Sequence, residues 1–202
     1  MDFGFVILPG AISARRVAEI GLAYDELMVP SSSPDFRAGS TTNRRYFVDS
    51  RMAFQDVYQH PPLLVACAQL IGRPFKLSSL LGRTLRAGSP AQQLHTDIAR
   101  DSADDALMAG FILMLDPFTP ANGATRFIPG SQSWPDLPSD ALADPRLDCE
   151  GEVLACGDAG SMIIFNAAVW HGHTANTTPK ARRSIQGYFV RCSADEAMHL
   201  PG

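Results

Sequence analysis

Apolar side chains recur at helical spacing in two regions near the start of the chain. In the first region they lie three or four positions apart, at Val17, Ile20, Tyr24, Leu27 and Met28. Ser13 is placed to cap this helix, and Pro30 lies beyond its end. The second region, Pro62–Ile71, has proline in its first turn and Gly72 as a stop signal. We therefore expect two helices before residue 74.

From residue 74 onward, short apolar or alternating runs are separated by clusters of Gly, Pro, Asn and Ser. These runs predict strands at Phe75–Arg86, Leu94–Ala99, Leu107–Leu115, Thr125–Ile128, Val153–Cys156, Ser161–Phe165 and Ser184–Arg191. Two segments lack periodicity: Ser31–Asn43 is expected to be a loop over a site, and Gln132–Gly151 an irregular excursion between strands. The order of elements favours a mostly β sandwich or barrel with flanking helices.

Length and composition narrow the class of protein. A chain of 202 residues suits a single domain, 1–202, with a strand and helices in 1–73 and a barrel core in 74–202. Its 46% hydrophobic and 19% charged residues fit a soluble globular protein without a membrane span. A net charge of −4 argues against a nucleic-acid partner. No signal-peptide pattern and no C-x-x-C spacing occur, so we expect a cytoplasmic protein with reduced thiols.

One histidine and one carboxylate lie two positions apart in the predicted strand at 94–99. On a strand, His95 and Asp97 would face the same side and could reach one ion. This pair alone is a weak signal, and a lone histidine such as His171, after an apolar strand, is more often a core residue. Together the three form the two-histidine, one-carboxylate set that suits non-haem iron(II) and leaves coordination positions open. Zinc would favour more sulfur, and no cysteine lies near these residues in sequence.

A pair of arginines follows His171 after a segment that reads as a turn. A reversal there would return Arg182 to the neighbourhood of the metal, where its guanidinium could bind a carboxylate bidentately. Ser184 would share its face and could add a hydroxyl to the same carboxylate. Arg183 should face the opposite way, as a solvated residue at a strand edge.

Taken in order, these motifs resemble the phytanoyl-CoA dioxygenase-like family of iron(II)/2-oxoglutarate oxygenases. The matching segments are Asp2–Gly10, Leu94–Asp97, Asn122–Ser131, Gly157-Asp158, Trp170–Gly172, Asn176 and Arg182–Ser184. The resemblance implies a double-stranded β-helix, a jelly-roll barrel like that of cupins, with iron bound by His95, Asp97 and His171. It also implies that Arg182, helped by Ser184, holds the distal carboxylate of 2-oxoglutarate. The cofactors would be Fe(II), 2-oxoglutarate and O2, and the products succinate and CO2.

The carboxylate at position 97 also bears on the expected reaction. Related halogenases have Gly or Ala there, which opens a position for halide, so Asp97 favours hydroxylation of a small organic substrate. The sequence identifies neither that substrate nor an oligomeric state.

Four further residues have open interpretations. Gln92 could hydrogen-bond the cosubstrate or the substrate, or simply lead into the strand. Arg126 could point into the barrel toward an acidic substrate or face outward. Trp170 could shield the metal from water or fill the core. His173, two residues after His171, is either a neighbour of the metal shell or an exposed side chain.

Two other functions stay open at this point. One is a cupin-type metalloenzyme that does not use 2-oxoglutarate, and the other is a non-catalytic binding module on the same barrel. Binding of 2-oxoglutarate through Arg182 would separate the oxygenase from both.

Overall fold

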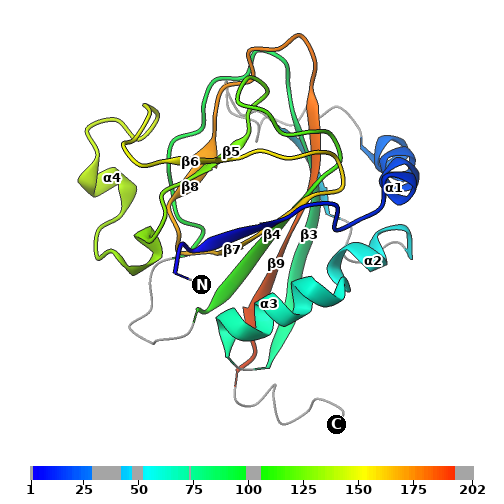
Figure 1. Ribbon diagram of the computed structural model, residues 1–202, viewed down its shortest axis with the longest axis horizontal. Helices are drawn as coiled ribbons and strands as arrows, with labels where there is room; N and C mark the ends of the chain where they lie inside the picture. Colours follow the sequence, from blue (N-terminus) through cyan, green and yellow to red (C-terminus); the bar gives the residue numbers. More distant parts are fainter. Residues whose placement is uncertain (1, 29–41, 47–51, 73, 99–105, 194–202) are drawn as a thin grey trace.

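Two antiparallel β-sheets face each other and helices flank one of them, as Figure 1 shows for this computed structural model. The structure describes residues 2–28, 42–46, 52–72, 74–98 and 106–193. Sheet A has the order β1-β7-β4-β9-β3-β2, and sheet B the order β6-β5-β8. The bounds are β1 Phe5–Leu8, β2 Thr42–Tyr46, β3 Phe75–Leu85, β4 Met108–Met114, β5 Thr125–Phe127, β6 Val153–Ala155, β7 Met162–Asn166, β8 His171–His173 and β9 Arg182–Arg191. This arrangement is the predicted jelly roll.

Most predicted strands are confirmed with bounds shifted by one or two residues, and one predicted strand is wrong. Leu94–Ala99 is not a strand, because only His95 forms a bridge, and it does so with His171. The predicted loop Ser31–Asn43 lies outside the described residues up to position 41, and β2 begins at Thr42. The excursion Gln132–Gly151 contains a short helix, α4, at Pro138–Ala141, after a 3-10 turn at Ser131–Ser133.

The two predicted helices form where the pattern placed them. The first, α1, spans Ala14–Leu27, and the Ser13 hydroxyl accepts a hydrogen bond from the backbone N–H of Arg16 at 3.4 Å. The second, α3, spans Pro61–Ile71 and ends at Gly72, whose φ of 65° is the left-handed conformation that glycine favours. A 3-10 turn, Met52–Phe54, and a short helix, α2 at Gln55–Tyr58, precede α3. None of the described helices combines the length and hydropathy needed to cross a bilayer.

Strand β4, inside sheet A, is buried on both faces, which explains its continuous apolar run. Phe111 and Leu113 belong to a cluster with residues of α1 and α3, whereas Ile112 and Met114 pack between the two sheets. Figure 1 shows α3 lying across sheet A on the side away from sheet B. A strand that contacts apolar groups on both faces has no position for a polar side chain, so its sequence loses the alternation of a half-exposed strand.

Two glycines in sheet A make room for aromatic rings on its opposite faces. A Cβ at Gly110 would lie 2.2 Å from the ring of Phe165, and a Cβ at Gly187 would lie 2.3 Å from the ring of Phe111. Both distances are well below van der Waals contact, so the rings depend on the absence of side chains here.

We therefore expect Gly187→Ala to lower the free energy of unfolding by about 1–3 kcal/mol, because the Phe111 ring must move within a packed core. The matched control is Gly21→Ala in α1, where the new Cβ would be 3.6 Å from the Arg183 guanidinium. That change should stabilise the protein by up to about 1 kcal/mol through helix propensity. Urea unfolding measures both, and an unchanged or raised stability of Gly187→Ala would contradict the packing argument.

Arg126 fastens the excursion to the outer face of sheet B. Its neighbour Phe127 faces the space between the sheets, so Arg126 points the opposite way and lies under the excursion with 1% of its surface exposed. The guanidinium donates to four backbone carbonyls at 2.8–3.1 Å and to one carboxylate at 3.2 Å, those of Leu147, Gln92, Pro145, Arg146 and Glu152. The side chain therefore faces outward from the barrel, which is one of the two expected orientations, but the excursion covers it and it is buried.

Removing this guanidinium should loosen the excursion. We expect Arg126→Met to lower the free energy of unfolding by about 2–4 kcal/mol, because several buried carbonyls lose their donor at once. Hydrogen exchange should also rise in residues 145–152. Arg15→Met on the exposed face of α1, where the side chain is 91% exposed, should change the stability by less than about 0.5 kcal/mol. Equal stabilities of the two variants would refute the role given to Arg126.

Candidate functional site

Backbone pairing brings the two parts of the predicted metal site together. His171 begins β8 and lies opposite Phe127 of β5 on one side and His95 on the other. The N–H and carbonyl groups of His95 and His171 bond to each other in both directions, at 2.9 Å each. The chain then turns away, and the Asp97 N–H donates to the Ala167 carbonyl at 2.9 Å. The carboxylate thus reaches the histidines from a turn and not from a strand.

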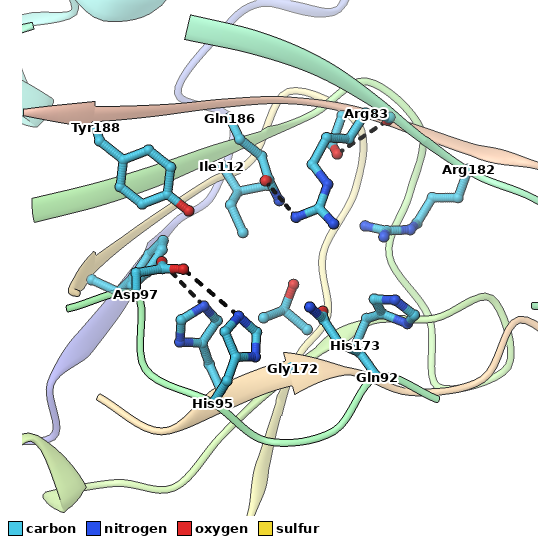
Figure 2. A pocket seen from close by; sticks show the side chains of 14 residues that line it. Arg83, Gln92, His95, Asp97, Ile112, Gly172, His173, Arg182, Gln186 and Tyr188 are labelled. Carbon is cyan, nitrogen blue, oxygen red and sulfur yellow. Dashed lines mark hydrogen bonds and ion pairs between the residues drawn. The ribbon is translucent and has the colours of Figure 1, made fainter. Parts of the chain in front are cut away.

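Both imidazoles present the same nitrogen to Asp97. His95 Nδ1 lies 3.1 Å from the Gln93 carbonyl, and His171 Nδ1 lies 2.9 Å from the Val169 carbonyl. A carbonyl only accepts, so each Nδ1 carries the proton and each Nε2 has a lone pair in the neutral ring. These Nε2 atoms face the carboxylate, at 3.6 Å from Oδ1 for His95 and 3.3 Å from Oδ2 for His171 (Figure 2).

This arrangement fits a cation. Two lone pairs directed at a carboxylate repel it, and the buried Asp97 Oδ2 accepts no hydrogen bond from the described residues. The three ligand atoms lie within 4.8 Å of one another, so one ion could contact all of them. Histidines that bind a metal usually donate their other N–H to a carbonyl, as both do here. Burial raises the pKa of Asp97, but hydrogen bonds from His171 and then His95, when these rings are protonated, outweigh burial and hold it well below its usual range, so positive charge at this place stabilises the carboxylate.

The opposite wall of the pocket is formed by alternate residues of β9, which face the space between the sheets. They are Arg182, Ser184, Gln186 and Tyr188, joined from β3 by Arg83. The Arg83 guanidinium donates to the Gln186 amide oxygen at 2.9 Å. Figure 2 shows this row facing His95, Asp97 and His173 across the pocket. The pocket is therefore a metal-type site on one wall and a set of hydrogen-bond donors on the other.

Arg182 is a buried cation with a guanidinium nitrogen, Nε, that has no hydrogen-bond partner among the residues that the structure describes. The residue is 6% exposed. Burial, and then the charge of Arg83, lower the pKa of Arg182 to about 9, so the group stays charged at neutral pH. Burying such a charge costs free energy unless an anion approaches it.

The adjacent Arg183 faces away from the pocket, as the alternation of side chains along a strand predicted. It is paired with carboxylates and not simply solvated. Arg183 points to the outer face of sheet A and forms ion pairs with Asp116 at 2.7 Å and Asp25 at 2.8 Å. Hydrogen bonds to Asp116 are the main reason why its pKa lies above the usual value.

The remaining candidates separate into pocket and core residues. Gln92 lines the pocket, and so does His173, which is only 6% exposed, so the alternative of an exposed His173 is wrong. Burial is the main cause that lowers the pKa of His173 to about 4. Trp170 is absent from the pocket lining and packs edge-on against Trp134, with the two ring centroids 5.0 Å apart. Arg126 is likewise held away from the pocket by the excursion.

Four polar pocket residues were not found from the sequence: Arg83, Thr125, Gln186 and Tyr188. Gln186 and Tyr188 could have been found, because they continue the alternation that begins with Arg182 and Ser184 on the same strand. Arg83 could not, because its position depends on the register in which β3 pairs with β9, where it lies opposite Ser184. Burial, and then the charge of Asp97, raise the pKa of Tyr188 above its usual value.

Known proteins with similar structures share this fold over most of the chain. HygX from Streptomyces hygroscopicus, solved with nickel, 2-oxoglutarate and hygromycin B, superposes with a TM-score of 0.77. It is 17% identical, and the match covers 94% of this chain and 84% of HygX. The 2-oxoglutarate-dependent epimerase SnoN from nogalamycin biosynthesis gives a TM-score of 0.75 at 21% identity, covering 94% and 79%. At these identities the likeness concerns the fold.

Sequence comparison finds relatives that are named dioxygenases. The dioxygenase ALT11 of Alternaria alternata is 33% identical over 165 residues, which cover 74% of this chain and 50% of that protein. The dioxygenase trt7 of Aspergillus terreus is 33% identical over 127 residues, covering 58% and 42%. The chain thus spans about half the length of these relatives. Residues 2–184 match the phytanoyl-CoA dioxygenase (PhyH) family, and with nearly the whole chain matched, the protein belongs to that family.

Proposed function

We propose that this protein is an iron(II)/2-oxoglutarate-dependent dioxygenase that oxidises a small organic molecule. The observation that carries this proposal is the pairing, in one pocket, of a two-histidine, one-carboxylate cluster with a buried arginine whose Nε lacks a protein partner. A metal ion alone would satisfy the cluster but would leave the guanidinium without an anion. A dicarboxylate that chelates the metal at one end satisfies both.

Each side chain then has a defined task. His95, Asp97 and His171 would hold the metal ion at the wall of the pocket. Arg182 binds the distal carboxylate of 2-oxoglutarate, and Ser184 and Gln92 line the path between that carboxylate and the metal. Bound iron(II) supplies the one chemistry that side chains lack, the activation of O2 coupled to decarboxylation of 2-oxoglutarate to succinate and CO2.

Apolar side chains keep the metal side of the pocket dry. Phe165 and Phe127 pack against the His171 ring at centroid distances of 4.9 and 5.7 Å, and Ile112 also lines the pocket. Excluding water from this side strengthens the electrostatic interactions of the site and limits reaction in the absence of substrate. With three protein ligands present, hydroxylation is the reaction we propose, and HygX and SnoN support a small molecule as the substrate class.

The cupin-type alternative predicts a different use of Arg182. If the metal acted without 2-oxoglutarate, a buried guanidinium with an unsatisfied Nε would have no role in the reaction. A binding module without turnover predicts ligand binding but no succinate. The following two predictions separate these functions.

Asp97→Ala should abolish high-affinity metal binding. The variant loses a charged ligand and leaves two neutral imidazoles, so the dissociation constant for Mn(II), a redox-stable substitute for iron, should rise about 100-fold or more. Calorimetric titration of the metal-free protein measures this constant. Asp136→Ala, at an exposed position of the excursion, should bind Mn(II) like the parent protein. Unchanged metal affinity in Asp97→Ala would overturn the ligand assignment.

Arg182→Ala should weaken 2-oxoglutarate binding to the Mn(II)-loaded protein about 100-fold, because a bidentate, charge-assisted interaction is lost. Succinate release from the iron-loaded variant should fall with it. The control is Arg183→Gln, which removes the neighbouring cation from the outer face and should leave the affinity for 2-oxoglutarate within about twofold. If both variants bound 2-oxoglutarate as the parent does, the oxygenase assignment would be dropped in favour of a metalloenzyme that does not use it.

A further inference from the structure

Arg182 and Arg183 are consecutive residues of β9 and have partners of opposite chemical kind. The Arg183 side chain is engaged edge-on by carboxylates, with Asp116 accepting from Nε at 3.1 Å and from a terminal nitrogen at 2.7 Å. The Arg182 guanidinium instead lies over the ring of Phe118, with Cζ 3.8 Å from the ring centroid. One arginine is neutralised by the protein, and the other is packed against an aromatic face.

Both partners come from the same short segment after β4. Asp116 and Phe118 are two residues apart, so they reach the outer and the inner arginine from a single turn of chain. Backbone hydrogen bonds in both directions between Phe118 and Gly157, at 2.8 and 3.1 Å, fix this segment. The Asn122 amide adds a third anchor by donating to the Pro117 carbonyl at 2.8 Å. The Phe118 ring, 2% exposed, is therefore held in one place beneath the guanidinium.

The geometry of a guanidinium makes this contact different from an ion pair. All five N–H bonds lie in the plane of the group and point outward from its edge, while an aromatic ring attracts the flat face. A carboxylate partner would occupy two of the edge donors and cancel the charge. Phe118 lies over the face of the group, so it fixes the plane of Arg182 without cancelling its charge, and Nε has no partner among the described residues.

We infer that Phe118 is a positioning residue of the cosubstrate site, which orients the Arg182 guanidinium for edge-on binding of the distal carboxylate of 2-oxoglutarate. This inference rests on the proposed function, since it concerns the affinity of Arg182 for that carboxylate. Among the described residues Phe118 does not line the pocket, so we expect it to act on the ligand through Arg182.

The test compares two 2-oxo acids that differ only at that end. 2-Oxoglutarate has the distal carboxylate, and 2-oxopentanoate has the same five-carbon chain but ends in a methyl group at that position. Each is titrated calorimetrically into Mn(II)-loaded parent protein, Phe118→Leu and Phe118→Tyr. Loss of a desolvated cation–aromatic contact should raise the dissociation constant of 2-oxoglutarate about 3- to 30-fold in Phe118→Leu. Phe118→Tyr keeps the ring and should restore the affinity to within about twofold. Binding of 2-oxopentanoate should be the same in all three proteins.

A purely structural role for Phe118 gives a different result. A collapsed pocket in Phe118→Leu would weaken both 2-oxo acids alike, and that outcome overturns the inference. The inference is also overturned if Phe118→Leu binds 2-oxoglutarate as tightly as the parent protein while Arg182→Ala no longer binds it. In the double variant with Arg182→Ala, the leucine should cause no further loss, because the guanidinium it acts through is gone. Failure of the parent protein to bind 2-oxoglutarate would instead overturn the proposed function itself.

Discussion

Side chains of β9 point alternately to the two faces of sheet A, and both the core and the pocket depend on this alternation. This strand lies between β4 and β3 in sheet A. One of its faces packs against the helices, and the other faces the pocket between the sheets. Ile185 and Phe189 pack under the helices, while Arg182, Ser184, Gln186 and Tyr188 line the pocket. A shift of one residue in the pairing would place Arg182 and Ser184 in the helical core and the apolar side chains in the pocket. The apolar contacts that stabilise the fold therefore also fix the position of the polar groups.

The two walls of the pocket are built by different means. On the β9 wall, side chains follow from a long regular strand whose register is fixed over ten residues. On the opposite wall, β8 is only three residues long, and His95 joins it through a single bridge. Two carbonyls, those of Gln93 and Val169, fix the orientation of the imidazoles there. On this wall, hydrogen bonds within two residues of each histidine thus orient the side chains, because the strand pairing is too short to do so.

Local patterns were enough to predict what depends on local chemistry. The N-cap and apolar face of α1 and the glycine end of α3 follow from residues that are close in sequence. The metal set was predicted from residue types, although the strand expected around His95 is a single bridge. Predictions failed where distant segments meet: Phe118 has no motif, and its role depends on a turn that Gly157 fixes from another part of the chain. The sequence left two orientations open for Arg126, and its burial depends on acceptors that lie mainly in the excursion.

The bridge between His95 and His171 has a consequence for the chain as a polymer. These residues are far apart in sequence, yet their backbones are hydrogen-bonded and their side chains converge on Asp97. An ion held there closes a long loop in the way that a disulfide does, so it reduces the conformational freedom that unfolding would release. The free concentration of metal then becomes a determinant of how long the barrel stays closed, independently of any turnover.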